Sequence, residues 1–123
     1  MSVAATVFVV RDVLQNVAYY RDMLGFQVGF TYGAPVFYAG LERDGAVIHL
    51  QAATHTKRQP GQGSVYIFVE ADVDALFREL AARGARVEKE PQDYPYGMRD
   101  FNLSDLDGND LCFGMESKTS TSR

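Results

Sequence analysis

An internal repeat is the feature that most limits what this chain can fold into. Residues 8–28 and 67–87 carry similar residues in the same order, at a constant shift of 59 positions. The matched pairs are Phe8 with Ile67, Val10 with Val69, Leu14 with Val73, Val17 with Leu76, Gly25 with Gly84, and Val28 with Val87. An Asp-Gly pair follows in both halves, at residues 44–45 and 107–108. The repeat indicates two copies of one module, each ordered strand, helix, strand, strand, turn and strand.

Each module contains one predicted helix with recognisable start and stop signals. Asp12 is a good N-cap residue, and Gln15 three positions later completes a capping box. Gly25 ends this helix, because glycine readily adopts the left-handed backbone. In module two, Asp72 stands at the favourable N-terminal end, and Gly84 stops the helix. The predicted apolar stripes are Val13, Val17, Tyr20 and Leu24 in module one, and Val73, Leu76, Phe77 and Leu80 in module two.

The remaining apolar segments alternate with polar residues, which is typical of strands. After the first strand of each module, the predicted strands cover residues 26–32, 36–43, 46–52, 85–90, 98–104 and 110–116. An Asp-Gly pair between two such segments is a strong hairpin signal, because a type I′ turn requires positive φ at both central residues. We therefore predict type I′ turns at residues 44–45 and 107–108.

The chain is predicted to be a single α+β domain with two helices and eight strands that form an open cleft, since 123 residues suffice for one core. Module one covers about residues 3–52, and module two covers about residues 64–116. The segment 53–63 between them is polar and contains Gly and Pro, so it is interpreted as a connector. Residues 117–123 have no apolar anchor, and this tail is predicted to be disordered.

The cleft is predicted from the number of helices. One helix covers one face of each four-stranded sheet, so the two uncovered faces are expected to curve toward each other. Side chains alternate along a strand: Ile48 and Leu50 belong under the helix, which turns His49 toward the cleft. Aromatic walls with a few polar groups are typical of small-molecule sites. The predicted ligand-binding residues are Phe37, Tyr38, His49, Gln51, Ser64, Tyr66, Phe68, Tyr96, Met98, Asp100, Asn102 and Cys112.

Charge and cysteine content argue against several classes of protein. A formal net charge of −4 and a pI of about 5.0 disfavour nucleic acid or an anionic membrane as a partner. The single cysteine, Cys112, cannot form an internal disulfide, so a secreted disulfide-rich fold is not expected. The apolar segment 3–10 is too short to span a membrane and has no basic residues before it, unlike a signal peptide. The expected location is the cytoplasm.

Two segments carry a resemblance to a known superfamily. "RDVLQNVAYYRDMLGF" and "PYGMRDFNLSDLDGN" are similar to the glyoxalase, bleomycin-resistance and extradiol-dioxygenase proteins, which share the vicinal oxygen chelate fold. The resemblance covers residues 3–116 and implies a homodimer. It also implies that enzymes of this type hold a divalent metal at positions that correspond to Ala5, His49, Ser64 and Cys112. Ala5 has no donor atom and Ser64 is a poor divalent ligand, so we expect no metal and no other cofactor.

The resemblance then favours the metal-free, bleomycin-resistance-like branch, whose dimeric members sequester a cationic antibiotic with planar rings. The leading hypothesis is a small-molecule binding protein for an aromatic or cationic compound, with Tyr96 at a stacking position and Asp100 able to meet a cation. One alternative is a glyoxalase- or dioxygenase-like lyase or isomerase with an unusual site built from His49 and Cys112. Another is an accessory interaction module with a vestigial cleft. Enzyme activity is thus left open, and Cys112 is expected to be a small hydrophobic residue of the cleft wall.

Overall fold

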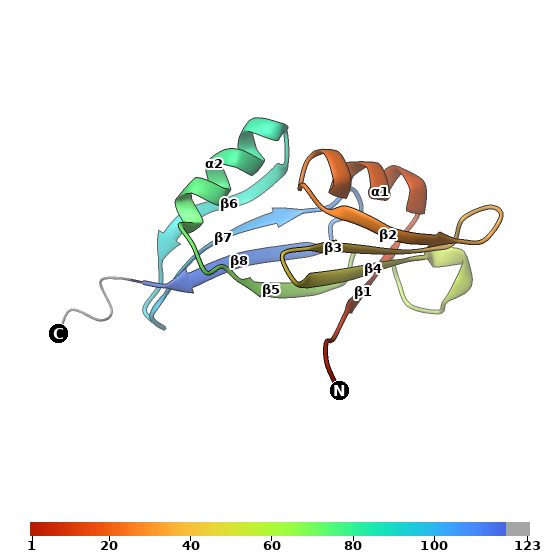
Figure 1. The fold of residues 1–123 in the computed structure, drawn as a ribbon, viewed down its shortest axis with the longest axis horizontal. Helices are drawn as coiled ribbons and strands as arrows, with labels where there is room; N and C mark the ends of the chain where they lie inside the picture. Colours follow the sequence, from red (N-terminus) through yellow and green to blue (C-terminus); the bar gives the residue numbers. More distant parts are fainter. Residues whose placement is uncertain (118–123) are drawn as a thin grey trace.

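The structure, a computed structural model, describes residues 1–117 and contains the two β-α-β-β-β modules (Figure 1). Module one consists of β1 (Thr6–Val10), α1 (Val13–Asp22), β2 (Gln27–Tyr32), β3 (Tyr38–Arg43) and β4 (Ala46–Ala52). Module two consists of β5 (Ser64–Phe68), α2 (Val73–Arg83), β6 (Arg86–Asp93), β7 (Met98–Ser104) and β8 (Asp110–Glu116). A short 3-10 helix, η1 (Ala53–His55), begins the connector. The predicted α+β class and the duplication are confirmed.

Each module forms its own four-stranded sheet, and the strand order is the same in both. The orders are β1-β4-β3-β2 and β5-β8-β7-β6. The first and last strands of a module pair in parallel, and the other pairs are antiparallel. Both α-helices lie on one side of the two sheets and leave the opposite side uncovered (Figure 1). We call this uncovered side the open face.

Three of the four helix ends follow the signals in the sequence. The prediction for the end of α1 is wrong: this helix ends at Asp22 with Met23 as a right-handed C-cap, two residues before Gly25. The Asp12 carboxylate accepts a hydrogen bond from the Gln15 backbone N–H at 3.0 Å, and α1 begins one residue later. The Asp72 carboxylate caps α2 in the same way, with bonds from the N–H groups of Asp74 and Ala75. Gly84 adopts a φ of 101° at the end of α2, so its left-handed backbone closes that helix as predicted.

The two Asp-Gly turns differ in conformation. Asp44 and Gly45 have φ angles of 51° and 89°, which confirms the predicted type I′ hairpin between β3 and β4. The prediction for residues 107–108 is wrong: only Gly108 has a positive φ there, and a five-residue loop from Asp105 to Asn109 joins β7 to β8. The loop is longer because the buried Asp105 carboxylate accepts backbone N–H groups of Asp107 and Asn109, which organises it from inside.

Alternation along the strands places the core as predicted. Ile48 and Leu50 on β4 are buried beneath α1, and His49 between them is only half-buried on the open face. On β7, Phe101 and Leu103 are buried in the same way. The core therefore lies between the helices and the sheets, and the residues that alternate with it point to the open face.

The loop Asp105–Asn109 also connects the two modules. The Tyr20 hydroxyl of α1 donates to Asp105 at 2.9 Å, and the Arg11 guanidinium forms an ion pair with Asp107 at 2.8 Å. A second contact joins β3 to α2 through the ion pair of Arg43 with Glu79 at 3.1 Å. These bonds hold the two modules together and thereby join the two halves of the open face.

The C-terminal end of the described chain is anchored. Ser117, the first residue of the predicted tail, is buried, and its N–H donates to the Gly97 carbonyl oxygen at 2.9 Å. The rest of that tail, residues 118–123, lies outside the described residues. Within residues 1–117, no helix has the length and apolar character required to cross a membrane.

Candidate functional site

Module one contributes an aromatic cluster to the open face. The Tyr38 hydroxyl and His49 Nδ1 are hydrogen-bonded at 3.0 Å. The ring of Phe30 stacks against Tyr38, with centroids 6.2 Å apart, and meets the His49 ring edge-on at 5.5 Å. Phe30 rests over Gly40, where a Cβ atom would collide with its ring. Since Phe30 remains 46% exposed, this cluster presents a flat apolar surface to the solvent.

Module two contributes a carboxylate that is held by two tyrosines. Asp100 on β7 is only 2% exposed although it points to the open face, because tyrosine rings cover it. The hydroxyls of Tyr66 and Tyr96 both donate to its Oδ2 atom, at 2.9 and 2.7 Å. Tyr66 reaches this position across Gly114, where a Cβ atom would collide with the tyrosine hydroxyl. We call these three hydrogen-bonded side chains, Tyr66, Asp100 and Tyr96, the tyrosine–aspartate site.

The surroundings of this site keep the hydroxyls of Tyr66 and Tyr96 and the nearby Cys112 thiol protonated. The hydrogen bond to Asp100, together with desolvation, raises the pKa of the Tyr96 hydroxyl to about 12. Burial raises the pKa of Tyr66 well above its ordinary range, and the bond to Asp100 adds to this effect. Burial also raises the pKa of the Cys112 thiol to about 12, and the charges of Asp100 and Asp110 act in the same direction. Among the described residues, no Lys or Arg forms an ion pair with Asp100.

Cys112 is therefore expected to react slowly as a nucleophile. At pH 8, alkylation by iodoacetamide should be about 10- to 100-fold slower in the folded protein than in the protein unfolded in urea. Because the pKa of the thiol is raised to about 12, the rate should also keep rising with pH between 8 and 10 instead of levelling off. A folded-state rate equal to the unfolded one, with a plateau near pH 9, would contradict this assignment.

Most of the other predicted ligand-binding residues also lie along the strands of the open face. Phe68 is 74% exposed, and its ring lies 5.1 Å from that of Tyr66. The Asn102 amide donates to both oxygens of Asp110, so this polar side chain has a partner within the chain. Gln51, Ser64 and Met98 occupy the same alternating positions on β4, β5 and β7.

Phe37 lies apart from this group. Its ring stacks on His55 at a centroid distance of 3.9 Å, and both line a hollow of about 470 Å³ at the start of α1. Three residues that the candidate list lacks belong to the open face instead: Phe30, which stacks there, and Gly40 and Gly114, which make room for the rings. The alternation of β2 carries a signal for Phe30, whereas a glycine beneath a ring leaves no signal in a single sequence.

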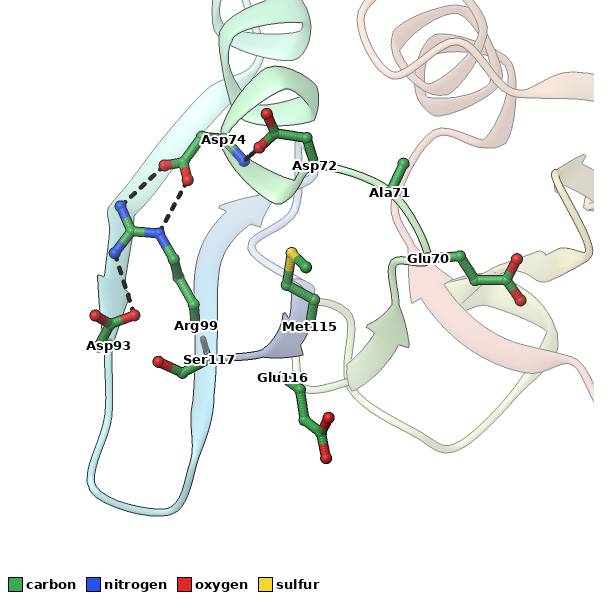
Figure 2. Close-up of a pocket in the computed structure, with 9 residues that line it drawn as sticks. All are labelled: Glu70, Ala71, Asp72, Asp74, Asp93, Arg99, Met115, Glu116 and Ser117. Carbon is green, nitrogen blue, oxygen red and sulfur yellow. Dashed lines mark hydrogen bonds and ion pairs between the residues drawn. The ribbon is translucent and has the colours of Figure 1, made fainter. Parts of the chain in front are cut away.

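A second hollow, of about 530 Å³, lies at the start of α2 (Figure 2). Its one basic group, Arg99, is paired with Asp74 at 2.9 Å and with Asp93 at 3.3 Å. The side chains of Glu70 and Glu116 point away from this arginine (Figure 2). None of the predicted ligand-binding residues lines this hollow, and its ion pairs tie β6 and β7 to the helix. We therefore treat it as a structural feature.

The donor atoms of the open face do not fit a divalent metal. In the strand register, Val7 lies directly opposite His49, and Tyr66 lies directly opposite Cys112. Valine has no donor atom, and the Tyr66 hydroxyl is bonded to Asp100. Ser64 pairs with Asp110, one step further along the same face. Within the described part of the chain, no three His, Cys, Asp or Glu side chains are grouped as a metal would require.

The sequence and the fold both match known proteins. The profile of the Glyoxalase/Bleomycin resistance protein/Dioxygenase superfamily matches residues 2–113. The bleomycin-binding protein of Streptomyces verticillus, solved with copper(II)-bleomycin, is 27% identical with a TM-score of 0.77, over 95% of this chain and 98% of that one. TnmS3, an antibiotic binding protein of Streptomyces sp. CB03234, is 25% identical with a TM-score of 0.77, over 95% and 97% of the two chains.

An enzyme has the same fold. The lactoylglutathione lyase of Agrobacterium tumefaciens is 19% identical with a TM-score of 0.75, over 98% of this chain and 96% of that one. At this identity the likeness shows the fold alone. No curated protein sequence was found to match the chain. The fold thus occurs in binding proteins and in an enzyme. The choice between a binding function and an enzymatic one therefore depends on the side chains of the open face.

Proposed function

Because the chain belongs to the Glyoxalase/Bleomycin resistance protein/Dioxygenase superfamily, we propose that it binds a small aromatic or cationic molecule on its open face without a metal. The exposure of aromatic rings on that face carries the proposal: Phe30, Phe68 and Tyr96 are 46%, 74% and 63% exposed. Two structural relatives at 25–27% identity are named for binding bleomycin or an antibiotic, which supports a ligand of this kind.

Exposed rings of this size are unfavourable unless something covers them. A Phe or Tyr ring buries a large apolar area when a planar molecule stacks on it, and that contact stabilises a complex. Phe30 and Phe68 lie on different modules, so a ligand or a second copy of the chain that covers both would bury rings of each. We further propose that the protein is a homodimer in which a second copy helps to cover this face, since Tyr32 on the edge strand β2, which pairs with Tyr38, is 65% exposed as well.

The enzyme alternative has less support from the side chains. His49 Nδ1 is hydrogen-bonded to Tyr38, and the Cys112 thiol has a pKa raised to about 12, so the pair lacks a ready nucleophile. The alternative of an accessory module with a vestigial cleft is also disfavoured. In such a module, the side chains of the protein itself are expected to pack together and close the open face. Instead, Phe68 and Tyr96 extend into solvent.

A melting experiment with two sets of additives tests the proposal. After chelator treatment, Zn²⁺, Ni²⁺, Mn²⁺ and Fe²⁺ are expected to leave the melting temperature unchanged under reducing conditions. In a panel of planar aromatic compounds, a binder present at about 100 times its dissociation constant should add about 2.7 kcal/mol, or roughly ten degrees.

Two outcomes would contradict the proposal in different ways. A rise with a metal that disappears in His49→Ala would favour the enzyme alternative and make His49 a ligand. A panel without any binder tighter than millimolar would count against small-molecule binding itself. His55→Ala is the matched control for His49→Ala. It removes the other of the two histidines, which stacks on Phe37 beside the α1 hollow and not on the open face.

A further inference from the structure

We propose that the tyrosine–aspartate site selects a cation that donates hydrogen bonds, such as a protonated amine, and rejects anions. The inference rests on the proposed function, because it assigns the chemical class of the molecule that the open face binds. It starts from three contacts: the bonds from Tyr66 and Tyr96 to Asp100, and the close packing of Tyr66 on Gly114.

The first step concerns the direction of the hydrogen bonds. A tyrosine hydroxyl has one proton, and both tyrosines donate theirs to Oδ2 of Asp100. The lone pairs of each phenol oxygen therefore remain for a molecule that approaches from solvent. Tyr66 and Tyr96 are 36% and 63% exposed, and with the carboxylate bound to their protons the phenol oxygens can accept hydrogen bonds but have no proton left to donate. Such a site matches N–H donors and repels carboxylates and phosphates.

The second step concerns charge. Asp100 is 2% exposed, and a carboxylate buried to this degree is costly unless hydrogen bonds and a cation compensate it. Two hydroxyls supply the hydrogen bonds, whereas no cation of the described chain pairs with it. The Arg99 guanidinium is bound to Asp74 and Asp93, and Lys89 on β6 lies opposite Asn102 without an ion pair. A bound ammonium group supplies the missing charge.

The third step is a comparison of the two modules. In the register of module two, Asp100 pairs with Gly114, two positions along β8 from Cys112. The equivalent position of module one is Gln51, two residues along β4 from His49, and it pairs with Tyr38. Module one therefore has a phenol where module two has a carboxylate. The preference for a cation belongs to module two alone, and the rings of module one provide a surface for an uncharged planar group.

Three probes of matched shape test the inference: 1-naphthylmethylamine, its N-acetyl derivative and 1-naphthoate, titrated by NMR at pH 7. The charged amine is expected to bind about tenfold or more tightly than the neutral derivative, because a hydrogen bond to a charged partner contributes more than a neutral one. 1-Naphthoate should bind most weakly. The amine should shift the amide signals of Tyr66 and Asp100.

Variants locate the preference. In Asp100→Asn, the amine should lose its advantage while the N-acetyl derivative binds as before. Gly114→Ala displaces the Tyr66 hydroxyl without removing a charge and should reduce the same advantage. Asp44→Asn is the control for net charge, because Asp44 lies in the β3–β4 turn, away from the open face, and it should leave all three affinities unchanged.

The outcomes separate the inference from the proposed function. Equal binding of the amine and its acetyl derivative in the wild-type protein would overturn the inference and leave the proposed function standing. An advantage of the amine that survives in both Asp100→Asn and Gly114→Ala would also overturn it. If no probe binds at millimolar concentration, the inference is overturned, and the panel of planar aromatic compounds then decides whether the proposed function fails as well.

Discussion

Replacing Asp105 with alanine is expected to lower the free energy of unfolding by about 3–5 kcal/mol, because several buried donors would lose their acceptor at once. A domain of this size has only about 5–15 kcal/mol of stability, so the melting temperature should fall by roughly 10–20 °C. Urea denaturation followed by circular dichroism measures the change. A loss below about 1 kcal/mol would show that the carboxylate carries little of the fold.

The reason lies in the four hydrogen bonds that Asp105 accepts. Its Oδ1 atom takes the N–H groups of Asp107 and Asn109, and its Oδ2 atom takes the Tyr20 hydroxyl and the Asn109 amide. All four bonds measure 2.9–3.0 Å, and Asp105 has no exposed surface. The Tyr20 bond crosses from α1 to the β7–β8 loop, so the same carboxylate shapes the loop and joins the modules.

Tyr20→Phe is the matched control for that substitution. It removes only one hydroxyl from the network and keeps the aromatic ring in the core, so it should cost about 1 kcal/mol. If Tyr20→Phe and Asp105→Ala were equally destabilising, the bond between the modules would account for the whole effect. The larger loss of unfolding free energy expected for Asp105→Ala, relative to Tyr20→Phe, then measures what the bonds within the loop contribute.

The same loop shows where sequence reasoning stops. Asp12, Asp72 and Gly84 act on backbone groups within a few residues of themselves, and for that reason their roles were predictable. Asp107 and Gly108 look like a local hairpin signal of the same kind. Their conformation is decided instead by Asp105 and by groups of α1 that are about 90 residues away in the chain.

For the candidate site, alternation determined which strand residues point to the open face, but it did not determine their partners. The sequence predicts Asp100 as a cleft residue able to meet a cation, whereas in the structure it is buried beneath Tyr66 and Tyr96. The contact with Tyr66 spans β7, β8 and β5, and it requires the small residue Gly114 between them. A pattern within one strand contains no information about such a neighbour.

A glycine in the connector provides the second large expected effect. Gly61→Ala should lower the free energy of unfolding by about 3 kcal/mol or more, because two separate penalties combine. Gly61 has a φ of 78°, which is unfavourable for alanine, and a Cβ atom there would collide with the backbone carbonyl oxygen of Asp107. The carbonyl cannot easily retreat, because Arg11 and Asn16 hold the Asp107 carboxylate.

Gly45→Ala isolates the contribution of that collision. Gly45 has a similar φ of 89°, but a Cβ atom there meets nothing within 4 Å, so only the backbone penalty of about 1 kcal/mol applies. The difference between the two variants in urea denaturation is therefore the energy of the contact between Gly61 and Asp107. Equal losses would mean that the connector can move away from the loop. A clear excess in Gly61→Ala would mean that the connector cannot move away from the loop, as expected if the Gly61 N–H bond to the Val9 carbonyl oxygen, at 3.1 Å, holds it in place.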